Sequence, residues 1–323
     1  MKQEKQIIIE KLLSVCDPWL QYAIRLNLLH ERKEDLDGLR VEAMKDAKIQ
    51  AYLNDITNFH DALVSNHKNP DLAIHKLLFL LDIGFDTSVF EIETAIGQIL
   101  NHKDRSGVYQ SLANIPQHYG GKGEDTFGWC LCDAPLMLLA LSKAKLDYGQ
   151  HIKQGVDYLA ALRTDRGFPC SVSEEHGKFR GPGKKGDCCP YATQIMLNLL
   201  SEFEEYRSGV IVIRSIDSIL SLWENSMVSH PYMFYMGNDF RKLKAPAIWH
   251  DILSVADCLS KFEFARTDTR FIEMIGIIKD KQHDNGMFTA ESVYQKCKNW
   301  EFGQKKTESP YLTYLCLRLF ERL

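Results

Sequence analysis

Three stretches of this chain bring together groups that could do chemistry: GWCLCDAP and GDCCP each place thiols beside a carboxylate, and APAIWHD places an imidazole beside a carboxylate. A further thiol follows Pro169. Thiolate, imidazole and carboxylate are the ligands that zinc prefers. We therefore expect a Zn²⁺ site formed by Cys132, Cys170 and Cys189, with Asp133 or His250 as fourth ligand and Cys130 and Cys188 as alternates. Zinc there would activate a thiolate or water, and the candidate catalytic residues are Asp133, His250 and Asp251.

The same residues also have a plainer interpretation as caps and core residues. Free cysteine is among the most buried residue types and often only fills space. Asp133 is placed to cap a helix, and His250 fits a hydrogen-bonded core histidine. The chain has nine cysteines, an odd number that is typical of free thiols or ligands rather than a disulfide framework. Both interpretations stay open at this point.

Two further groups of residues are candidates for binding a substrate. The segment 174–187 carries four glycines and four cations, and such a segment favours a phosphate or diphosphate. Its cations are Lys178, Arg180, Lys184 and Lys185. Aromatic side chains that would line a cavity for an isoprenoid are Trp129, Tyr191, Trp249 and Tyr311. The alternatives are a solvated surface loop and ordinary core aromatics.

Prolines indicate the helices that must position these residues. Six of them precede apolar segments: Pro18, Pro70, Pro135, Pro190, Pro246 and Pro310. Proline suits the first turn of a helix because its missing N–H has no partner there. We expect six helices to begin at these prolines, several of them capped by a preceding polar residue: Asp17, Asn69, Asp133 and Ser309.

A second pattern repeats in phase with the first, with a period of about 60 residues. Its glycines are Gly107, Gly167 and Gly286, each followed two residues later by a ring. Each glycine is expected to supply the left-handed conformation that ends a second, more polar helix. Because the Pro-started helices are apolar nearly all round, they belong inside. The sequence therefore predicts an all-α fold, an α/α toroid of about six helical hairpins. The pattern fails over 224–240.

One copy of this pattern, Gln282-x3-Gly286-x-Phe288, resembles the end of the Gln-Trp repeat of squalene and hopene cyclases. The whole pattern resembles the prenyltransferase/squalene-oxidase repeat group, which has a terpenoid cyclase-like α/α toroid, over roughly residues 70–323. The resemblance implies this fold. It also implies a zinc site, because protein prenyltransferases hold a catalytic zinc at the starts of inner helices. The chain departs from the family because it has neither Asp-x-Asp-Asp nor Asp-Asp-x-x-Asp.

Three functions follow as competing expectations. The first is a prenyltransferase- or cyclase-like enzyme that acts on an isoprenoid or other apolar substrate in the cavity, with zinc at the rim. The second is a non-catalytic binding protein of the same fold. The third is a carbohydrate-active hydrolase or lyase, which needs carboxylates facing each other across the sugar. Asp133, Asp187 and Asp251 are its candidates.

Composition limits the class of protein. The net charge is −4 without a basic tail, so we expect no nucleic-acid partner. No segment approaches the roughly 20 apolar residues of a membrane helix, and the apolar run near the N-terminus is shorter than a signal peptide requires. We expect a cytoplasmic protein with one domain over 1–323, weakly repeat-like over 1–67 and clearly repeated over 68–323.

Overall fold

The computed structural model describes residues 2–64, 66–179, 181, 187–229 and 237–323. Within these ranges most residues are helical, which confirms the all-α prediction. The described strands, β1 (Ser111–Asn114) and β2 (Asp125–Gly128), form one small antiparallel hairpin. No described helix is both long enough and apolar enough to cross a membrane.

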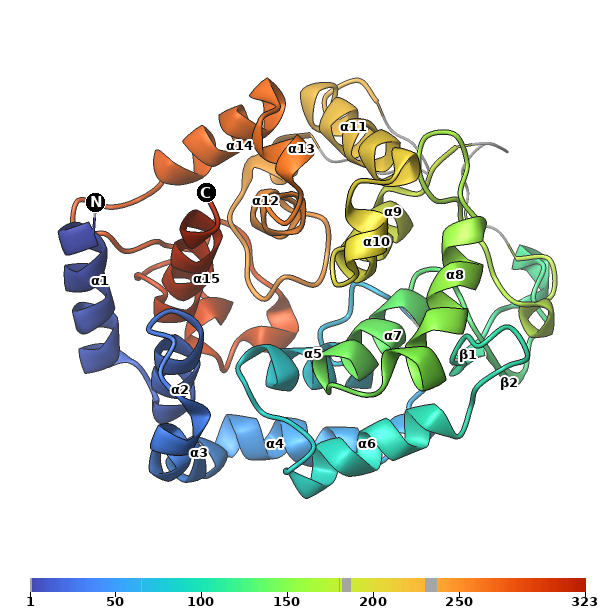
Figure 1. Cartoon of the computed structure of the whole chain (residues 1–323), viewed down its shortest axis with the longest axis horizontal. Helices are drawn as coiled ribbons and strands as arrows, with labels where there is room; N and C mark the ends of the chain where they lie inside the picture. Colours follow the sequence, from blue (N-terminus) through green and yellow to red (C-terminus); the bar gives the residue numbers. More distant parts are fainter. Residues whose placement is uncertain (1, 65, 180, 182–186, 230–236) are drawn as a thin grey trace.

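Twelve of the described helices alternate between an inner and an outer position along the chain (Figure 1). The inner helices are α2 (Pro18–Asn27), α5 (Ala73–Asp82), α7 (Ala134–Lys143), α9 (Pro190–Leu200), α12 (Ile252–Leu259) and α15 (Pro310–Glu321). The outer helices are α1 (Lys2–Val15), α4 (Ala47–Ile56), α6 (Phe90–Leu100), α8 (Lys153–Ala161), α11 (Val210–Glu224) and α14 (Thr269–Lys279). Further described helices lie in the connections: α3 (Asp37–Met44), α10 (Glu204–Arg207) and α13 (Glu263–Arg266).

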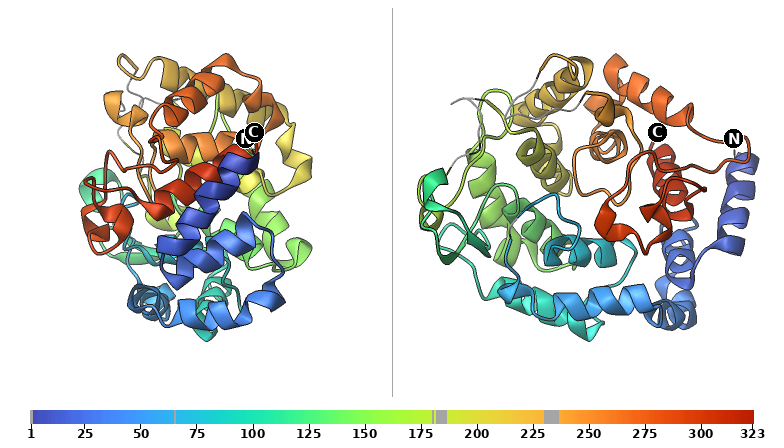
Figure 2. Two further views of the ribbon diagram at one scale, coloured as in Figure 1. Left: turned by 90° about the vertical axis from the view of Figure 1, so that its left-hand side faces the viewer. Right: turned by 180° about the vertical axis from the view of Figure 1, so that it is seen from behind.

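The inner helices follow one another around a centre. Contacts run from α5 to α7, α9, α12, α15 and then α2. Hydrogen bonds close the circle, because the Asn27 side chain of α2 donates to the carbonyl of Asp82 in α5 at 3.1 Å and to the Tyr314 hydroxyl of α15 at 2.9 Å. The two ends of the chain also meet (Figure 2), where Lys5 of α1 pairs with Glu321 of α15 at 2.7 Å.

Burial follows the predicted division between inner and outer helices. In α7 every residue from Ala134 to Leu141 is buried, as expected of a helix that is apolar all round. In α14 the buried residues are Phe271, Met274, Ile275 and Ile278, which occupy one face. The outer helices therefore keep one face in water.

The repeat is also visible in the hydrogen bonds at two inner-helix starts. At α9 the Phe168 amide donates to Thr193 Oγ1 at 3.0 Å, and the Cys189 amide donates to the Phe168 carbonyl at 2.8 Å. Two repeat periods later, the Phe288 amide donates to Thr313 Oγ1 at 3.0 Å. The Ser309 amide donates to the Phe288 carbonyl at 2.8 Å. The loop after one outer helix is thus fixed to the next inner helix in the same way twice.

The helix starts differ in part from the prediction. Pro18, Pro135, Pro190 and Pro310 lie in first turns as predicted. Helix α5 begins at Ala73, after Pro70. The prediction for Pro246 is wrong, because α12 begins at Ile252. There Asp251 and Ser254 form a capping box that fixes the helix start.

The expected caps and helix ends also need correction. Ser309 caps α15 as predicted, but the described contacts of Asp17 and Asn69 include no such side-chain cap. The three repeat glycines do have positive φ, but they lie in loops beyond the last helical residues. At Gly286 the amide closes a turn onto the His283 carbonyl at 2.8 Å, and an added Cβ would lie 2.4 Å from Ile8. Close packing of the loop, rather than helix termination, requires that glycine.

Candidate functional site

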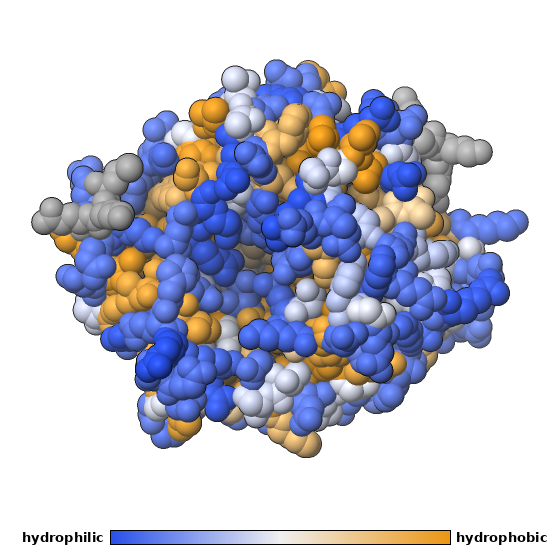
Figure 3. All heavy atoms as spheres, viewed as in Figure 1, coloured by the Kyte–Doolittle hydropathy of each residue, from blue (hydrophilic) through white to orange (hydrophobic). Residues whose placement is uncertain are grey.

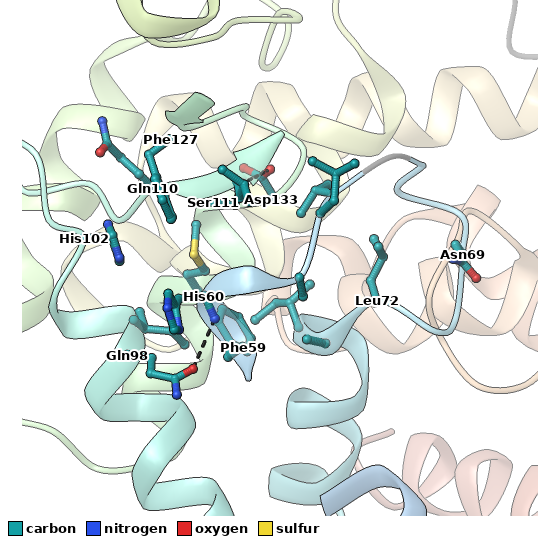
Figure 4. A pocket seen from close by; sticks show the side chains of 18 of the residues that line it. Phe59, His60, Asn69, Leu72, Gln98, His102, Gln110, Ser111, Phe127 and Asp133 are labelled. Atoms are coloured by element: carbon teal, nitrogen blue, oxygen red, sulfur yellow. Dashed lines mark hydrogen bonds between the residues drawn. The ribbon is translucent and has the colours of Figure 1, made fainter. Parts of the chain in front are cut away.

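Two cavities of about 140 Å³ each lie next to the inner helices. The central cavity is lined by α5, α7, α9, α12, α15 and residues 246–248. The second, which we name the Asp133 pocket, lies between the starts of α5 and α7, the end of α6 and the β-hairpin (Figure 4). An apolar cavity of roughly 150 Å³ holds one benzene-sized group, so each space suits a small ligand or one end of a larger one.

One part of the wall of the central cavity is apolar and aromatic, and another part is charged. Apolar lining comes from Phe79, Leu136, Leu139, Ile195, Tyr191 and Tyr311. Charged lining comes from Asp82, Lys143, Asp257, Lys261 and Arg318. These charges lie near the C-terminal ends of the inner helices, and the space-filling view shows a hydrophilic hollow near the middle of the ring (Figure 3).

Ion pairs hold both lining carboxylates in the charged form. Asp82 contacts Arg318 Nη1 at 2.6 Å and Lys143 Nζ at 3.3 Å. Burial alone would raise the pKa of Asp82, but these two cations hold it well below its usual range. Asp257 pairs with Arg322, which likewise outweighs burial and lowers the pKa of Asp257.

Two polar groups in the same wall lack a partner among the described residues. They are the Tyr191 hydroxyl and Arg318 Nε. Tyr191 is only 2% exposed, and its ring stacks on Trp249 with centroids 4.3 Å apart. An unsatisfied buried donor costs about 1–3 kcal/mol. A water molecule or a ligand in the central cavity would relieve that cost.

Asp133 lies at one side of its pocket beside Ser111, whereas His60, Gln98 and His102 lie at another (Figure 4). The Asp133 carboxylate accepts the Cys130 amide at 2.9 Å and the Ser111 hydroxyl at 2.8 Å. Its Oδ2 also lies 3.5 Å from His67 Nε2. Asp133 occupies the N-cap position of α7 without bonding into the helix. Its role here is to fix strand β1 to the start of α7.

Some of the cysteines that were predicted to bind zinc lie close together. Cys132 and Cys189 lie close enough for their side chains to interact, and Cys189, the N-cap residue of α9, makes no side-chain hydrogen bond that caps the helix. The interaction with Cys132 lowers the pKa of Cys189 despite its burial, whereas the interaction with Cys189 and burial both raise the pKa of Cys132. Cys130 and Cys170 are close enough to add charge interactions with Cys132.

This cluster does not show the ligand set that zinc requires. Among the described residues, no three His, Cys, Asp or Glu side chains are grouped to hold a metal ion. The Asp133 oxygens are occupied by Ser111 and Cys130, and the described contacts of His250 are with Gln194 and Phe240. Zinc at this rim therefore stays a prediction, and we derive no chemistry from it.

His250 and Asp251 are not among the described residues that line the two cavities. His250 is 4% exposed, and burial lowers its pKa to about 3. Asp251 caps α12, and burial raises its pKa to about 7. Asp133 and Asp251 are each enclosed by protein rather than facing each other across a groove. Asp187, the third candidate, lines a different pocket from Asp133, together with Arg166 and Arg214, so the described pockets do not pair these carboxylates as a glycosidase requires.

The predicted substrate-binding residues divide into three groups. Tyr191 and Tyr311 line the central cavity, and Trp249 packs against Tyr191. Trp129 instead donates to Asp104 at 3.0 Å and contacts Tyr158. Of the predicted anion-binding loop, Lys178 is exposed, whereas Arg180, Lys184 and Lys185 lie outside the described residues.

The sequence interpretation missed the charged residues of the central cavity. Asp82 and Arg318 interrupt apolar runs, LLFLLD and LCLRLF, in helices predicted to be buried. A charge at such a position is rarely buried without a partner. That interruption was the signal that would have identified both residues as facing a cavity or each other.

Comparisons with known proteins place no family name on this chain. No family model matches it, and no curated protein matches it. Solved structures of the type II terpene cyclase MstE from Scytonema are similar in shape. A variant bound to geranylgeranyl dihydroxybenzoate has 11% identity and a TM-score of 0.45, covering 99% of this chain and 96% of that one. The apo enzyme has 11% identity and a TM-score of 0.44, covering 98% and 96%. Similarity at this level does not assign a function to the chain.

Proposed function

We propose that this chain is a terpenoid cyclase-like α/α toroid that binds a small ligand with an apolar, isoprenoid-sized end in its central cavity. The observation that carries the proposal is the Tyr191 hydroxyl, a buried donor without a described partner in a cavity lined by five inner helices. Ligand sites combine an apolar lining with a few convergent polar groups, and this cavity has both.

The charges favour an anionic group on the ligand. Among the described lining residues, Lys143, Lys261 and Arg318 are cationic, and two are carboxylates already paired with cations. Arg318 Nε, which has no described partner, is free to donate to a ligand oxygen. A five-carbon isoprenyl group fits the volume, with its phosphate or carboxylate near these cations.

Binding is favoured over cyclisation by the state of the lining carboxylates. A cyclase that starts by protonating its substrate needs a carboxylic acid in contact with that substrate. Asp82 and Asp257 are held ionised by Arg318, Lys143 and Arg322, so they are poor proton donors. We therefore propose a binding function of the kind that a non-catalytic member of this fold would have.

The test is isothermal titration calorimetry of the purified chain with dimethylallyl diphosphate, with inorganic diphosphate and dimethylallyl alcohol titrated separately. We expect the diphosphate ester to bind more tightly than either half. Tyr191→Phe should weaken binding roughly tenfold, because it removes one hydrogen bond to the ligand. The matched control is Tyr22→Phe, which removes a hydroxyl that donates to the Gly84 carbonyl at 3.3 Å outside the cavity lining. Equal weakening by both variants, or no binding of any probe, would overturn the proposal.

A further inference from the structure

The Asp133 pocket is separate from the cavity to which we assign a ligand. None of its described lining residues also lines the central cavity. Its volume of about 140 Å³ is close to the roughly 150 Å³ of a cavity that holds benzene. Much of its lining is apolar, including Phe59, Leu72, Ile74, Ile99, Leu112 and Met137. The pocket therefore has room for one six-membered ring.

The charges around this pocket differ from those of the central cavity. No described lining residue is a lysine or an arginine. The two lining carboxylates are already engaged, because Asp71 pairs with Lys296 at 3.4 Å and Asp133 accepts the Ser111 hydroxyl at 2.8 Å. An anion placed here would lose its hydration without gaining a cationic partner in the lining. The pocket therefore favours a neutral molecule over an anion.

Three rings, those of His60, His102 and Phe127, lie on the same side of the pocket (Figure 4). His102 stacks on Phe127 with ring centroids 3.9 Å apart and an interplanar angle of 7°. The His60 ring is inclined to that of His102 by 14°, with centroids 6.1 Å apart. Because aromatic rings interact favourably with one another in stacked or edge-on contacts, this side of the pocket favours an aromatic ligand.

His60 also carries a hydrogen-bonding atom that the described part of the chain leaves unused. Its Nε2 lies 3.1 Å from Asp61 Oδ1, so this nitrogen carries the proton of the neutral ring. Nδ1 is then an acceptor, and it is buried without a partner among the described residues. A buried polar atom without a hydrogen bond is unfavourable. A hydroxyl group on a ligand beside His60 would donate to it.

We propose that the Asp133 pocket binds a phenol, a neutral molecule with one aromatic ring and a hydroxyl group. The ring packs against the three rings named above, and the hydroxyl donates to His60 Nδ1. The Gln98 side chain holds His60 in place, because it accepts the His60 amide at 3.1 Å and donates to the Thr57 carbonyl at 2.8 Å. This site does not depend on the ligand proposed for the central cavity, so either proposal can fail without the other.

The Met137 methyl group reports on the pocket, because Met137 is buried and belongs to the lining. The full-length chain, with ¹³C in the methyl groups of its nine methionines, is titrated with phenol at about pH 8, where free imidazole is neutral. Met137→Leu assigns the signal. We expect a saturable shift of the Met137 methyl resonance and none of the Met274 resonance, which belongs to the outer helix α14. Benzoate, which is charged, and cyclohexanol, which is not flat, should each bind more weakly than phenol.

A variant tests the hydrogen bond itself. His60→Phe keeps a ring but removes the acceptor, so it should weaken binding of phenol roughly fivefold relative to binding of toluene. The matched control is His118→Phe, since His118 also lies beside a ring, that of Tyr119 at 4.1 Å, but is outside the pocket lining. The control should leave the ratio of the two affinities unchanged.

The wild-type chain alone can overturn the proposal. It fails if phenol causes no saturable shift of Met137, or if benzoate or cyclohexanol binds as tightly as phenol. An unchanged affinity ratio in folded His60→Phe would exclude the hydrogen bond to Nδ1. If that variant does not fold, Ala62→Leu narrows the pocket at a half-buried lining residue and should remove the shift. A full Met137 shift in Ala62→Leu would show that phenol binds elsewhere.

Discussion

The starts of α9 and α15 share one backbone frame but differ in the groups that face the cavities. In both, a phenylalanine amide donates to a threonine hydroxyl of the inner helix, at 3.0 Å each. In α15 the cap is Ser309, whose hydroxyl accepts the Leu312 amide at 3.1 Å. In α9 the cap residue is Cys189, whose side chain makes no capping hydrogen bond.

The residue two positions after each cap is a tyrosine in both helices, but its contacts differ. Tyr311 packs among the rings of Trp19, Phe79 and Phe302. Tyr191 stacks on Trp249, and its hydroxyl lacks a described partner. The hydrogen bonds to threonine are common to both helix starts and hold the fold. The cap and the tyrosine differ, and at these two positions α9 departs from what stability alone requires.

A third helix start extends the comparison to an ionisable cap. Asp251 caps α12, and burial raises its pKa from 3.8 to about 7. Between about pH 4 and 7 the folded chain keeps a proton that the unfolded chain has released. The free energy of unfolding should therefore fall as pH rises, by about 1 kcal/mol per pH unit.

The measurement is denaturation at several pH values for wild type and for Asp251→Asn, which keeps a good cap. The difference between the two curves isolates Asp251, since the buried histidines are common to both. A pH-independent difference between pH 4 and 7 would show that Asp251 ionises normally.

Removing the threonine hydrogen bond should lower the free energy of unfolding by a similar amount at the starts of α9 and α15. Thr193→Val and Thr313→Val each leave a buried phenylalanine amide without its acceptor, which costs about 1–3 kcal/mol. Urea denaturation of both variants should give losses of similar size. A loss at only one position would mean that the two frames are not equivalent, despite their matching hydrogen bonds.

The sequence was sufficient to predict most inner helices, because proline at a helix start and a continuous apolar run are local signals. It also placed Cys132 and Cys189 at equivalent points, and the structure places them close enough for their side chains to interact. The surroundings of each thiol were beyond prediction, because they depend on which way each side chain turns at the end of a loop.

The charged end of the central cavity was missed for a different reason. Asp82 and Arg318 are 236 positions apart, and they meet because α15 returns to the same circle as α5. No spacing rule connects residues so far apart in the chain. The predicted helix start at Pro246 was wrong for a local reason. The Asp251–Ser254 capping box, rather than the proline, fixes the start of α12.

The smallest effects test whether Cys189 is kept for stability. Ser309→Ala removes a helix cap and should cost about 1 kcal/mol. Cys189→Ser replaces one cap by a residue that usually caps better, so it should change the free energy of unfolding of the reduced chain by less than about 0.5 kcal/mol. Both values come from urea denaturation under dithiothreitol. If Cys189→Ser were as costly as Ser309→Ala, the thiol would be a structural requirement of α9. If it is neutral, the thiol is not needed for stability, and the capping hydrogen bond of Ser309 is what distinguishes the start of α15 from that of α9.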